Sequence, residues 1–432
     1  QKDGADLEMD DRIILDPNTD DGSIIIQGAV GVLDDGVYQC IATNPHGKAL
    51  SGKVTLNQTK ISLNSGTIPV DVQREVGESL KMELWNSLTY VPSVEYSWKT
   101  VDRDTNLGPQ LLTSRRIAID QATGSLYFAN VLITDDITAK NQIYKIDVTN
   151  SFEDTTIGGA PYSLVVTANS APANRVPARM VPEDPAYVHY ALKGEDTVLK
   201  CFFEGLPTPE VTWRQPSTGP PPSRIDCTQE SYTECLIRSV EYSDEGIYTC
   251  TGKNSEGEQS FNVQLIVESV PSIENAPPSG NATIGTSKSF LCNPDAVPPA
   301  TITWYSNGNE ISRGDTGSPR IIISEDSQNL TVTSVCKDCS TGPSSDIQVF
   351  QCKVSNKHGD QYVSAYLNVI EPVEIYDKGE TQEIIVDPDI GEKLLGNFTC
   401  RARVDELIMD SLEIMWFHDG ARVYNGYPYT LD

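Results

Sequence analysis

The chain has 432 residues, and its 32 Lys and Arg against 61 Asp and Glu leave a formal net charge of −29. Proteins that bind nucleic acid neutralise phosphates with clustered Lys and Arg, so this charge argues against a nucleic-acid partner. The four histidines offer little for a metal centre or a Ser-His-Asp triad, and we expect no enzyme activity and no cofactor. No apolar run reaches about 18 residues, so no membrane-spanning segment is predicted.

The first predicted elements are two short strands and a hairpin. Residues 12–14 and 23–26 are rich in Ile, which favours strands. Residues 34–47 then read DDGVYQCIATNPHG, with a Tyr two positions before Cys40 and an Asn-x-x-Gly run after it. A Tyr at this place is typical of the tyrosine corner that enters a sandwich strand, and Asn-x-x-Gly is typical of the turn that follows.

This hairpin pattern occurs four times in the sequence. It returns at residues 244–257 and 346–359, with a weaker copy at 144–150, so the cysteine or its substitute falls at positions 40, 146, 250 and 352. A repeat of about 100 residues built on this strand is typical of tandem immunoglobulin domains. We therefore predict an all-β chain of tandem immunoglobulin-like sandwiches of the I-set or C2-like type.

The repeat predicts five domains in chain order. The first holds only the later strands of a sandwich and the last only the early strands, so we expect both to be truncated. Domains three and four each carry the complete spacing of Cys, Trp and Cys, at Cys201, Trp213 and Cys250 and at Cys292, Trp304 and Cys352. The predicted domains are residues 1–59, 60–168, 177–268, 269–371 and 372–432.

Domain two keeps the pattern without its central cysteines. The strand B cysteine position holds Leu84, the strand F position holds Ile146, and Trp98 is the expected core tryptophan. Losing a native disulfide typically costs about 2–5 kcal/mol, whereas burying Leu and Ile recovers about 1.5–3 kcal/mol each. We expect this domain to fold, with a smaller free energy of unfolding than its neighbours.

The ten cysteines are assigned by their place in the repeat. Cys40 and Cys400 stand at strand F and strand B positions whose partners would lie beyond the two ends of the sequence. The other eight pair within the chain, which indicates an oxidising extracellular compartment and a chain cut inside its first and last domains. The predicted pairs are the central bridges Cys201–Cys250 and Cys292–Cys352 and the local bridges Cys227–Cys235 and Cys336–Cys339.

Residues 336–345 look like an insertion before strand F of domain four. Cys336-x-x-Cys339 also has the spacing of a redox-active or zinc-binding pair. A zinc site needs more ligands than these two, and no second pair lies nearby in the sequence. We therefore interpret the pair as a structural disulfide and predict no metal site.

An Arg-Ile dipeptide precedes strand F in each of the first four domains, at Arg12, Arg116, Arg224 and Arg320. In sandwiches of this type we expect the Arg to form an ion pair with the Asp six residues before the strand F cysteine. Domain two has Lys140 at that position, which leaves Arg116 without a predicted partner. The expected acceptors in the other domains are Asp34, Asp244 and Asp346.

Two kinds of surface motif bear on function. Arg313-Gly314-Asp315 is an integrin-type tripeptide in a polar loop, although a chance match is the simpler alternative. Four Asn-x-Ser/Thr sequons fit a secreted chain that carries sugars. They lie at Asn57, Asn281, Asn329 and Asn397.

Three stretches resemble a known family. They are GSLYFANV at residues 124–131, GLPTP at 205–209 before Trp213, and FQCKVSNKHGDQYVSAY at 350–366. These stretches are similar to the first domains of the neuroglian group of neural cell adhesion molecules. The loss of both central cysteines in domain two departs from the family pattern.

The resemblance implies a four-domain horseshoe in which domains one and two fold back onto domains four and three. Residues 168–179 are polar and contain Pro, and about ten extended residues span up to roughly 33 Å, enough for the chain to double back. The family implies a cell-surface receptor at the plasma membrane that binds itself or related immunoglobulin-superfamily receptors on an opposing cell, in neural adhesion and axon guidance. Two alternatives are a soluble, hemolin-like immune recognition protein and the ectodomain of a receptor enzyme.

Overall fold

The structure is a computed structural model. The regular elements that it describes are β-strands, apart from a short α-helix and three 3₁₀ turns, so the predicted all-β class is confirmed. The same residues contain no helix with the length and apolar character that crossing a membrane requires. The described residues are 1–19, 21–28, 31–45, 47–63, 68–84, 88–91, 93–150, 152, 155–168, 175–181, 187–216, 223–227, 233–375, 400–405, 409–410 and 412–425.

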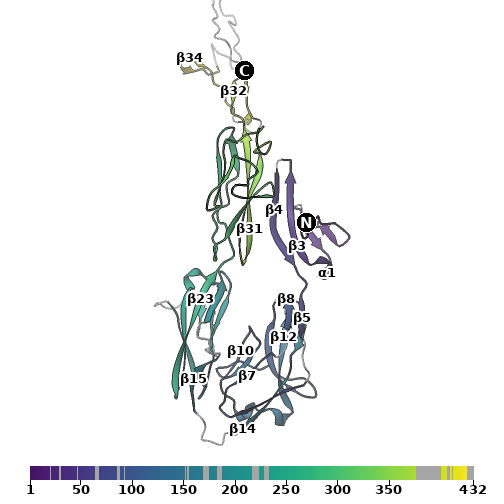
Figure 1. The fold of residues 1–432 in the computed structure, drawn as a ribbon, viewed down its shortest axis with the longest axis vertical. Coiled ribbons are helices and arrows are strands. Elements are labelled where there is room, and N and C mark those ends of the chain that lie inside the picture. The colour runs from purple at the N-terminus through teal and green to yellow at the C-terminus, as the bar shows by residue number, and fades with distance from the viewer. Residues whose placement is uncertain are drawn as a thin grey trace, which may run out of the picture. The chain divides into compact units, whose positions relative to one another are not determined.

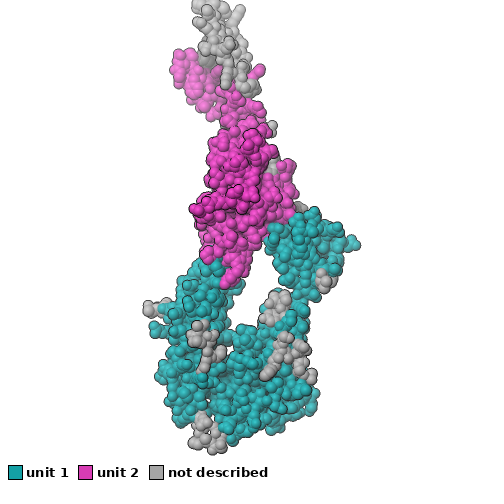
Figure 2. Space-filling view, viewed as in Figure 1, with its two compact units in different colours: residues 1–39, 53–270, 296–298 teal, residues 40–52, 271–295, 299–432 magenta. Residues whose placement is uncertain are grey.

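The chain forms two compact units, which Figure 2 colours separately. Unit 1 comprises residues 1–39, 53–270 and 296–298, and unit 2 comprises residues 40–52, 271–295 and 299–432. The division passes through predicted domain one, because residues 40–52 group with the later part of the chain.

Domain one contains two strand pairs, and Figure 1 labels the strands of the second pair as β3 and β4. β1 (Ile13–Leu15) pairs antiparallel with β2 (Ile24–Ile26), and β3 (Gly36–Asn44) pairs with β4 (Gly47–Leu56) after the short helix α1 (Gly31–Asp34). The Tyr38 hydroxyl donates to the Asp34 carbonyl oxygen at 2.7 Å, which is the predicted tyrosine corner. At the other end of β3, the Gly47 amide donates to Asn44 Oδ1 at 2.8 Å and closes the hairpin.

Domain two is a sandwich of two main sheets. One has the order β10-β11-β7, and the other has the order β13-β12-β14-β6 with β9 also paired to β12; β5 and β8 form a further pair. The strands are β5 (Lys60–Leu63), β6 (Val70–Glu75), β7 (Leu80–Met82), β8 (Leu88–Val91), β9 (Glu95–Asp102), β10 (Ile117–Ile119), β11 (Leu126–Phe128), β12 (Gln142–Asn150), β13 (Thr155–Gly158) and β14 (Tyr162–Thr167), with turns η1 (Ile133–Asp135) and η2 (Thr138–Lys140).

Domain three has the same plan, with sheets β16-β23-β22-β19, β17-β21-β20 and β15-β18. β15 begins one residue before the predicted start of the domain, and residues 169–174 of the predicted linker lie outside the described residues. The elements are β15 (Val176–Met180), β16 (Tyr187–Leu192), β17 (Thr197–Lys200), β18 (Phe203–Leu206), β19 (Glu210–Arg214), β20 (Ile225–Asp226), β21 (Glu234–Ile237), η3 (Tyr242–Asp244), β22 (Gly246–Asn254) and β23 (Gly257–Glu268).

Domain four has sheets β24-β31-β30-β26-β27 and β25-β29-β28, and short strand pairs follow it, β32 with β33 and β34 with β35. The strands are β24 (Gly280–Thr283), β25 (Lys288–Leu291), β26 (Thr301–Ser306), β27 (Asn309–Ile311), β28 (Ile321–Ile323), β29 (Asn329–Val332), β30 (Gln348–Asn356), β31 (Gly359–Ile370), β32 (Glu374–Ile375), β33 (Ala402–Arg403), β34 (Phe417–His418) and β35 (Ala421–Arg422).

The register of strand C against strand F is the same in three domains. Trp213 lies opposite Cys250 and Trp304 opposite Cys352. In domain two Trp98 lies opposite Ile146, so Ile146 occupies the place of the strand F cysteine. Trp98 and Ile146 are almost fully buried, and Leu84 packs against the same core. The described part of the chain contains four disulfides, Cys201–Cys250, Cys227–Cys235, Cys292–Cys352 and Cys336–Cys339.

The ion pairs of domains one, three and four form as expected. Arg12 Nη1 lies 3.0 Å from Asp34 Oδ2, Arg320 Nη2 lies 2.9 Å from Asp346 Oδ1, and Arg224 contacts Asp244. The three Asp side chains are at most 3% exposed. Because the carboxylates are buried, these ion pairs differ from exposed ion pairs, whose contribution to folding stability is small.

Arg116 also has a carboxylate partner, which corrects the sequence prediction. Its Nη1 and Nη2 lie 2.6 Å and 3.0 Å from the two carboxylate oxygens of Asp135. The prediction was wrong because it counted back from strand F to Lys140, whereas the extra turn η2 places the equivalent Asp five residues earlier in the chain. The Tyr144 hydroxyl donates to the Asp135 carbonyl oxygen at 2.9 Å, and burial raises the pKa of Tyr144.

Candidate functional site

Within unit 1, domain two packs against domain three through a small apolar contact. The rings of Tyr127 and Phe202 lie 5.9 Å apart between centroids, and Ala129 is buried beside them. Tyr127 and Phe202 are 9% and 8% exposed. Aromatic pairs at this separation add about 0.5–1.5 kcal/mol beyond the area that they bury.

A buried amide gives this contact its polar bonds. Asn130 is 1% exposed, and its Nδ2 donates to the Gly205 carbonyl oxygen at 2.8 Å and to Thr208 Oγ1 at 3.0 Å. The Gly205 amide donates back to the Ala129 carbonyl oxygen at 3.1 Å. A buried polar side chain is costly unless its hydrogen bonds are made, so these bonds select the partner surface.

The loop that receives Asn130 is held from inside domain three. Asn254 Nδ2 donates to the carbonyl oxygens of Pro207 and Val176, at 2.9 Å and 2.8 Å. A Cβ atom on Gly205 would lie 2.9 Å from Asn254 Nδ2, which leaves little room for a side chain there. The Asn of the Asn-x-x-Gly hairpin therefore fixes the surface that domain two contacts.

Within unit 2, the end of the domain-one hairpin packs on the outer face of domain four. The Leu50 amide donates to Gln351 Oε1 at 2.8 Å, and Gln351 Nε2 donates to the Leu50 carbonyl oxygen at 2.8 Å. Asn307 Oδ1 makes a longer contact of 3.4 Å with the Lys48 amide. Gln351 is 1% exposed and also donates to Ser364 Oγ at 3.0 Å.

The Gln351 amide group binds β4 as a neighbouring strand would. One side chain supplies both the acceptor and the donor that a ladder partner offers to a single residue. The fit is close, because a Cβ atom on Gly47 would lie 2.7 Å from Val349 Cγ2. This contact explains why residues 40–52 belong to unit 2. Domains two and three therefore contact each other inside unit 1, and residues 40–52 contact domain four inside unit 2.

The Arg-Gly-Asp tripeptide lies at the tip of a tight turn in domain four. Ser312 and Asp315 exchange backbone hydrogen bonds of 3.1 Å and 2.9 Å, and Gly314 between them has a φ of +88°. The three residues are exposed. The Arg313 side chain is 60% exposed and lies 3.4 Å from Glu325 in an exposed ion pair.

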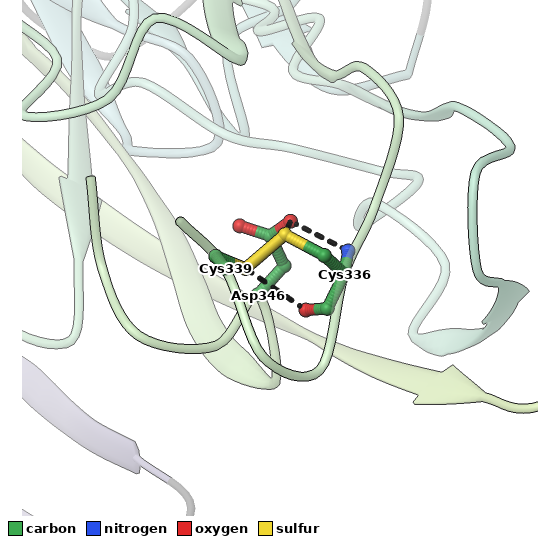
Figure 3. Close-up of side chains that lie close together, drawn as sticks. All are labelled: Cys336, Cys339 and Asp346. Atoms are coloured by element: carbon green, nitrogen blue, oxygen red, sulfur yellow. Dashed lines mark hydrogen bonds between the residues drawn. A yellow bond between two sulfur atoms is a disulfide. The ribbon is translucent and has the colours of Figure 1, made fainter. Parts of the chain in front are cut away.

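The insertion before strand F is closed on itself. Figure 3 shows Asp346 beside the Cys336–Cys339 disulfide, where Asp346 Oδ2 accepts a hydrogen bond from the Cys336 amide at 3.0 Å. The two sulfurs and this carboxylate lie close enough to one another to hold a cation. Zinc binds the thiolate form of cysteine, however, and a disulfide contains no thiolate.

The predicted sequons fall on strands and near strand ends. Asn57 and Asn281 are exposed, and Asn329 on β29 is half-buried. Asn281 Oδ1 accepts a hydrogen bond of 3.0 Å from Asn368 Nδ2. Asn397 lies outside the described residues.

These observations define a class of protein, a chain of tandem immunoglobulin sandwiches with specific contacts inside each unit. Residues 185–267 and 271–369 match the family described as the Immunoglobulin I-set domain, and these two segments are I-set domains. The chain is 28% identical over 393 residues to neural cell adhesion molecule L1 of Takifugu rubripes, covering 89% of this chain and 29% of that protein. It is 27% identical over 385 residues to contactin-5 of Rattus norvegicus, covering 88% of this chain and 32% of that protein.

Several solved structures share the fold, among them those of hemolin and Sidekick-1. The insect immune protein hemolin has a TM-score of 0.62 at 22% identity, covering 85% of this chain and 90% of that chain. The first four immunoglobulin domains of Sidekick-1 have a TM-score of 0.59 at 18% identity, covering 81% and 86%. The predicted resemblance to neural cell adhesion molecules and the tandem immunoglobulin fold are therefore confirmed. The chain spans less than a third of the length of the two relatives named above.

The residues that form these contacts were not predicted from the sequence as contact residues. Asn130, Gly205 and Gln351 all lie in the three stretches that carried the resemblance. One signal was available for Asn130, since it is a polar residue in the apolar run LYFANV of residues 126–131. A polar residue at such a place needs a partner, although the sequence does not say which one.

Proposed function

We propose that this chain is part of a cell-surface adhesion receptor that binds proteins on an opposing cell, either further copies of itself or related immunoglobulin-superfamily receptors. The observation that carries the proposal is a pair of contacts. Asn130 joins domain two to domain three, and Gln351 joins domain four to residues 40–52 of domain one. The names of the relatives, a neural cell adhesion molecule and a contactin, support the same role and favour neural adhesion and axon guidance.

In this role the paired domains act as a preformed binding surface. Fixing domains in advance lowers the entropy lost when a partner binds. Individual contacts between receptors are weak, and many copies facing one another across two membranes add their affinities through multivalency. Such a mechanism involves no chemical step, in keeping with a binding protein that is not an enzyme.

Bead aggregation tests the proposal. Beads coated with the 432-residue chain should clump with one another or with beads that carry a related receptor. Gln351→Leu removes both bonds to Leu50 and should reduce clumping severalfold, whereas Gln73→Ala changes an exposed amide on β6 and should not. Beads that ignore both receptors would overturn the proposal, and beads that bind bacteria or haemocytes instead would favour the soluble, hemolin-like recognition role.

A second candidate partner is an integrin, favoured by the exposed position of Arg313-Gly314-Asp315 at the tip of a turn. Asp315→Glu keeps the charge and lengthens the side chain by one methylene. Attachment of integrin-bearing cells to the coated surface should fall with this variant and stay unchanged with Asp326→Glu. Equal attachment to wild type and Asp315→Glu would exclude an integrin role for the tripeptide.

A further inference from the structure

The disulfide loop of domain four is anchored on the Arg320–Asp346 ion pair. Asp346 exchanges two bonds with Cys336. The Cys336 amide donates to the carboxylate at 3.0 Å (Figure 3), and the Asp346 amide donates to the Cys336 carbonyl oxygen at 3.0 Å. Arg320 binds the same carboxylate and also the carbonyl oxygen of Thr341. The disulfide closes a loop with two residues between its cysteines, so the backbone of Lys337 is held in one place.

Lys337 points from this loop to a carboxylate beyond domain four. Its ammonium group forms an ion pair with Asp405, whose side chain is 5% exposed. The Asp405 carboxylate also accepts a hydrogen bond of 3.2 Å from the Glu371 amide, at the end of domain four. A carboxylate buried to this extent is costly without a positively charged or hydrogen-bonding partner, and Lys337 supplies the charge.

The segment that carries Asp405 is attached at the same place by backbone bonds. β32, which follows Glu371, pairs with β33, so residues 374–375 and 402–403 form a small ladder. Arg403 lies 3.8 Å from Glu371 in a further, exposed ion pair. Asp405 therefore meets the disulfide loop and the junction between domains four and five at one point inside unit 2.

We propose that the loop closed by Cys336–Cys339 is a clamp, which holds the start of domain five on domain four through the ion pair between Lys337 and Asp405. This assigns a role to an insertion that the immunoglobulin sandwich does not need. The disulfide restricts Lys337 before contact, which lowers the entropy cost of the ion pair. A clamp at this junction would limit bending between the two domains whether or not the chain mediates adhesion.

Hydrogen exchange on the full chain tests the clamp. The exchange rate is measured in peptides that cover residues 370–375 and 400–405. Lys337→Gln and Asp405→Asn should each speed exchange there about tenfold, because local opening becomes easier. The double variant should exchange no faster than the faster single variant, since both changes break the same pair. Asp338→Asn removes a charge from the same loop and should leave these peptides unchanged.

A variant with Cys336→Ser and Cys339→Ser separates the effect of the disulfide on exchange from the effect of the Lys337 charge. It should speed exchange at the same junction while β30 keeps its protection, which shows that domain four is still folded. The proposal fails if Lys337→Gln leaves the junction peptides unchanged. It also fails if Asp338→Asn speeds them as much, or if the serine variant leaves the junction protected with β30 intact.

Discussion

Asn130 Nδ2 lies 2.8 Å from the carbonyl oxygen of Gly205, and this hydrogen bond joins two immunoglobulin domains. The amide is buried at the contact and has a second acceptor in Thr208. Two of the stretches that resemble neural cell adhesion molecules thus meet at one side chain. Residues 124–131 therefore contribute both to the core of domain two and to the way that two sandwiches pack.

We expect Asn130→Asp to weaken the contact between domains two and three, because a carboxylate cannot donate to Gly205 and would be buried near its carbonyl oxygen. The loss should be about 1–3 kcal/mol, the usual cost of an unsatisfied buried polar group. Hydrogen exchange at the Gly205 amide, which bonds to Ala129, measures this opening directly. Asn309→Ala, on the exposed edge strand β27, should have no such effect, and an unchanged Gly205 rate in Asn130→Asp would contradict the assignment.

Arg116→Leu should destabilise domain two by about 3 kcal/mol, because it leaves the Asp135 carboxylate, 8% exposed, without its partner. The free energy of opening can be taken from hydrogen exchange along β12. Glu83→Gln breaks the exposed pair between Lys81 and Glu83 in the same domain and should cost less than about 1 kcal/mol. If the two variants cost the same, the ion pair of Arg116 is not a buried one in solution.

A disulfide can be restored in domain two. Ile146 stands at the strand F cysteine position, and a Cβ atom on Gly159 would touch both Ile146 and Leu84, so these two side chains lie close together. Leu84→Cys with Ile146→Cys should form the missing bridge and stabilise the domain by about 2–4 kcal/mol under oxidising conditions. Mass spectrometry detects the bridge, and exchange along β12 measures the gain. The reduced double variant is the control and should be less stable than wild type, since it loses apolar volume.

Acid should destabilise the part of domain three around His189. Burial, and then the nearby Lys200, lowers the pKa of His189, whose Nε2 lies 2.6 Å from Thr197 Oγ1. The unfolded chain therefore takes up a proton at a higher pH than the folded chain does. The stability that neutral His189 contributes is fully present above the ordinary pKa of 6.5. It is lost as the pH falls through the pKa of His189 in the folded protein. As the pH falls from 7.5 to 5, the melting temperature should fall further for wild type than for His189→Gln. An equal fall in the two proteins would contradict the lowered pKa of His189.

The sequence by itself determined the repeat, the strands around it and the disulfide pairs. These features depend on local patterns, such as a Tyr two residues before a Cys and apolar residues at every second position, because a strand places alternate side chains on one face. The same local reasoning located Leu84 and Ile146 as the residues in place of the missing bridge. It failed for Arg116, because the partner depends on the length of a loop that no strand pattern predicts.

The tertiary structure decided which domain surfaces meet and which side chains join them. Leu50 and Gln351 are 301 residues apart in the chain and exchange two hydrogen bonds. Each side chain alone looks like an ordinary strand residue, since many amides could satisfy the same donor and acceptor. The choice among them depends on how whole sandwiches pack, and such packing brings together residues whose sequence positions carry no information about each other.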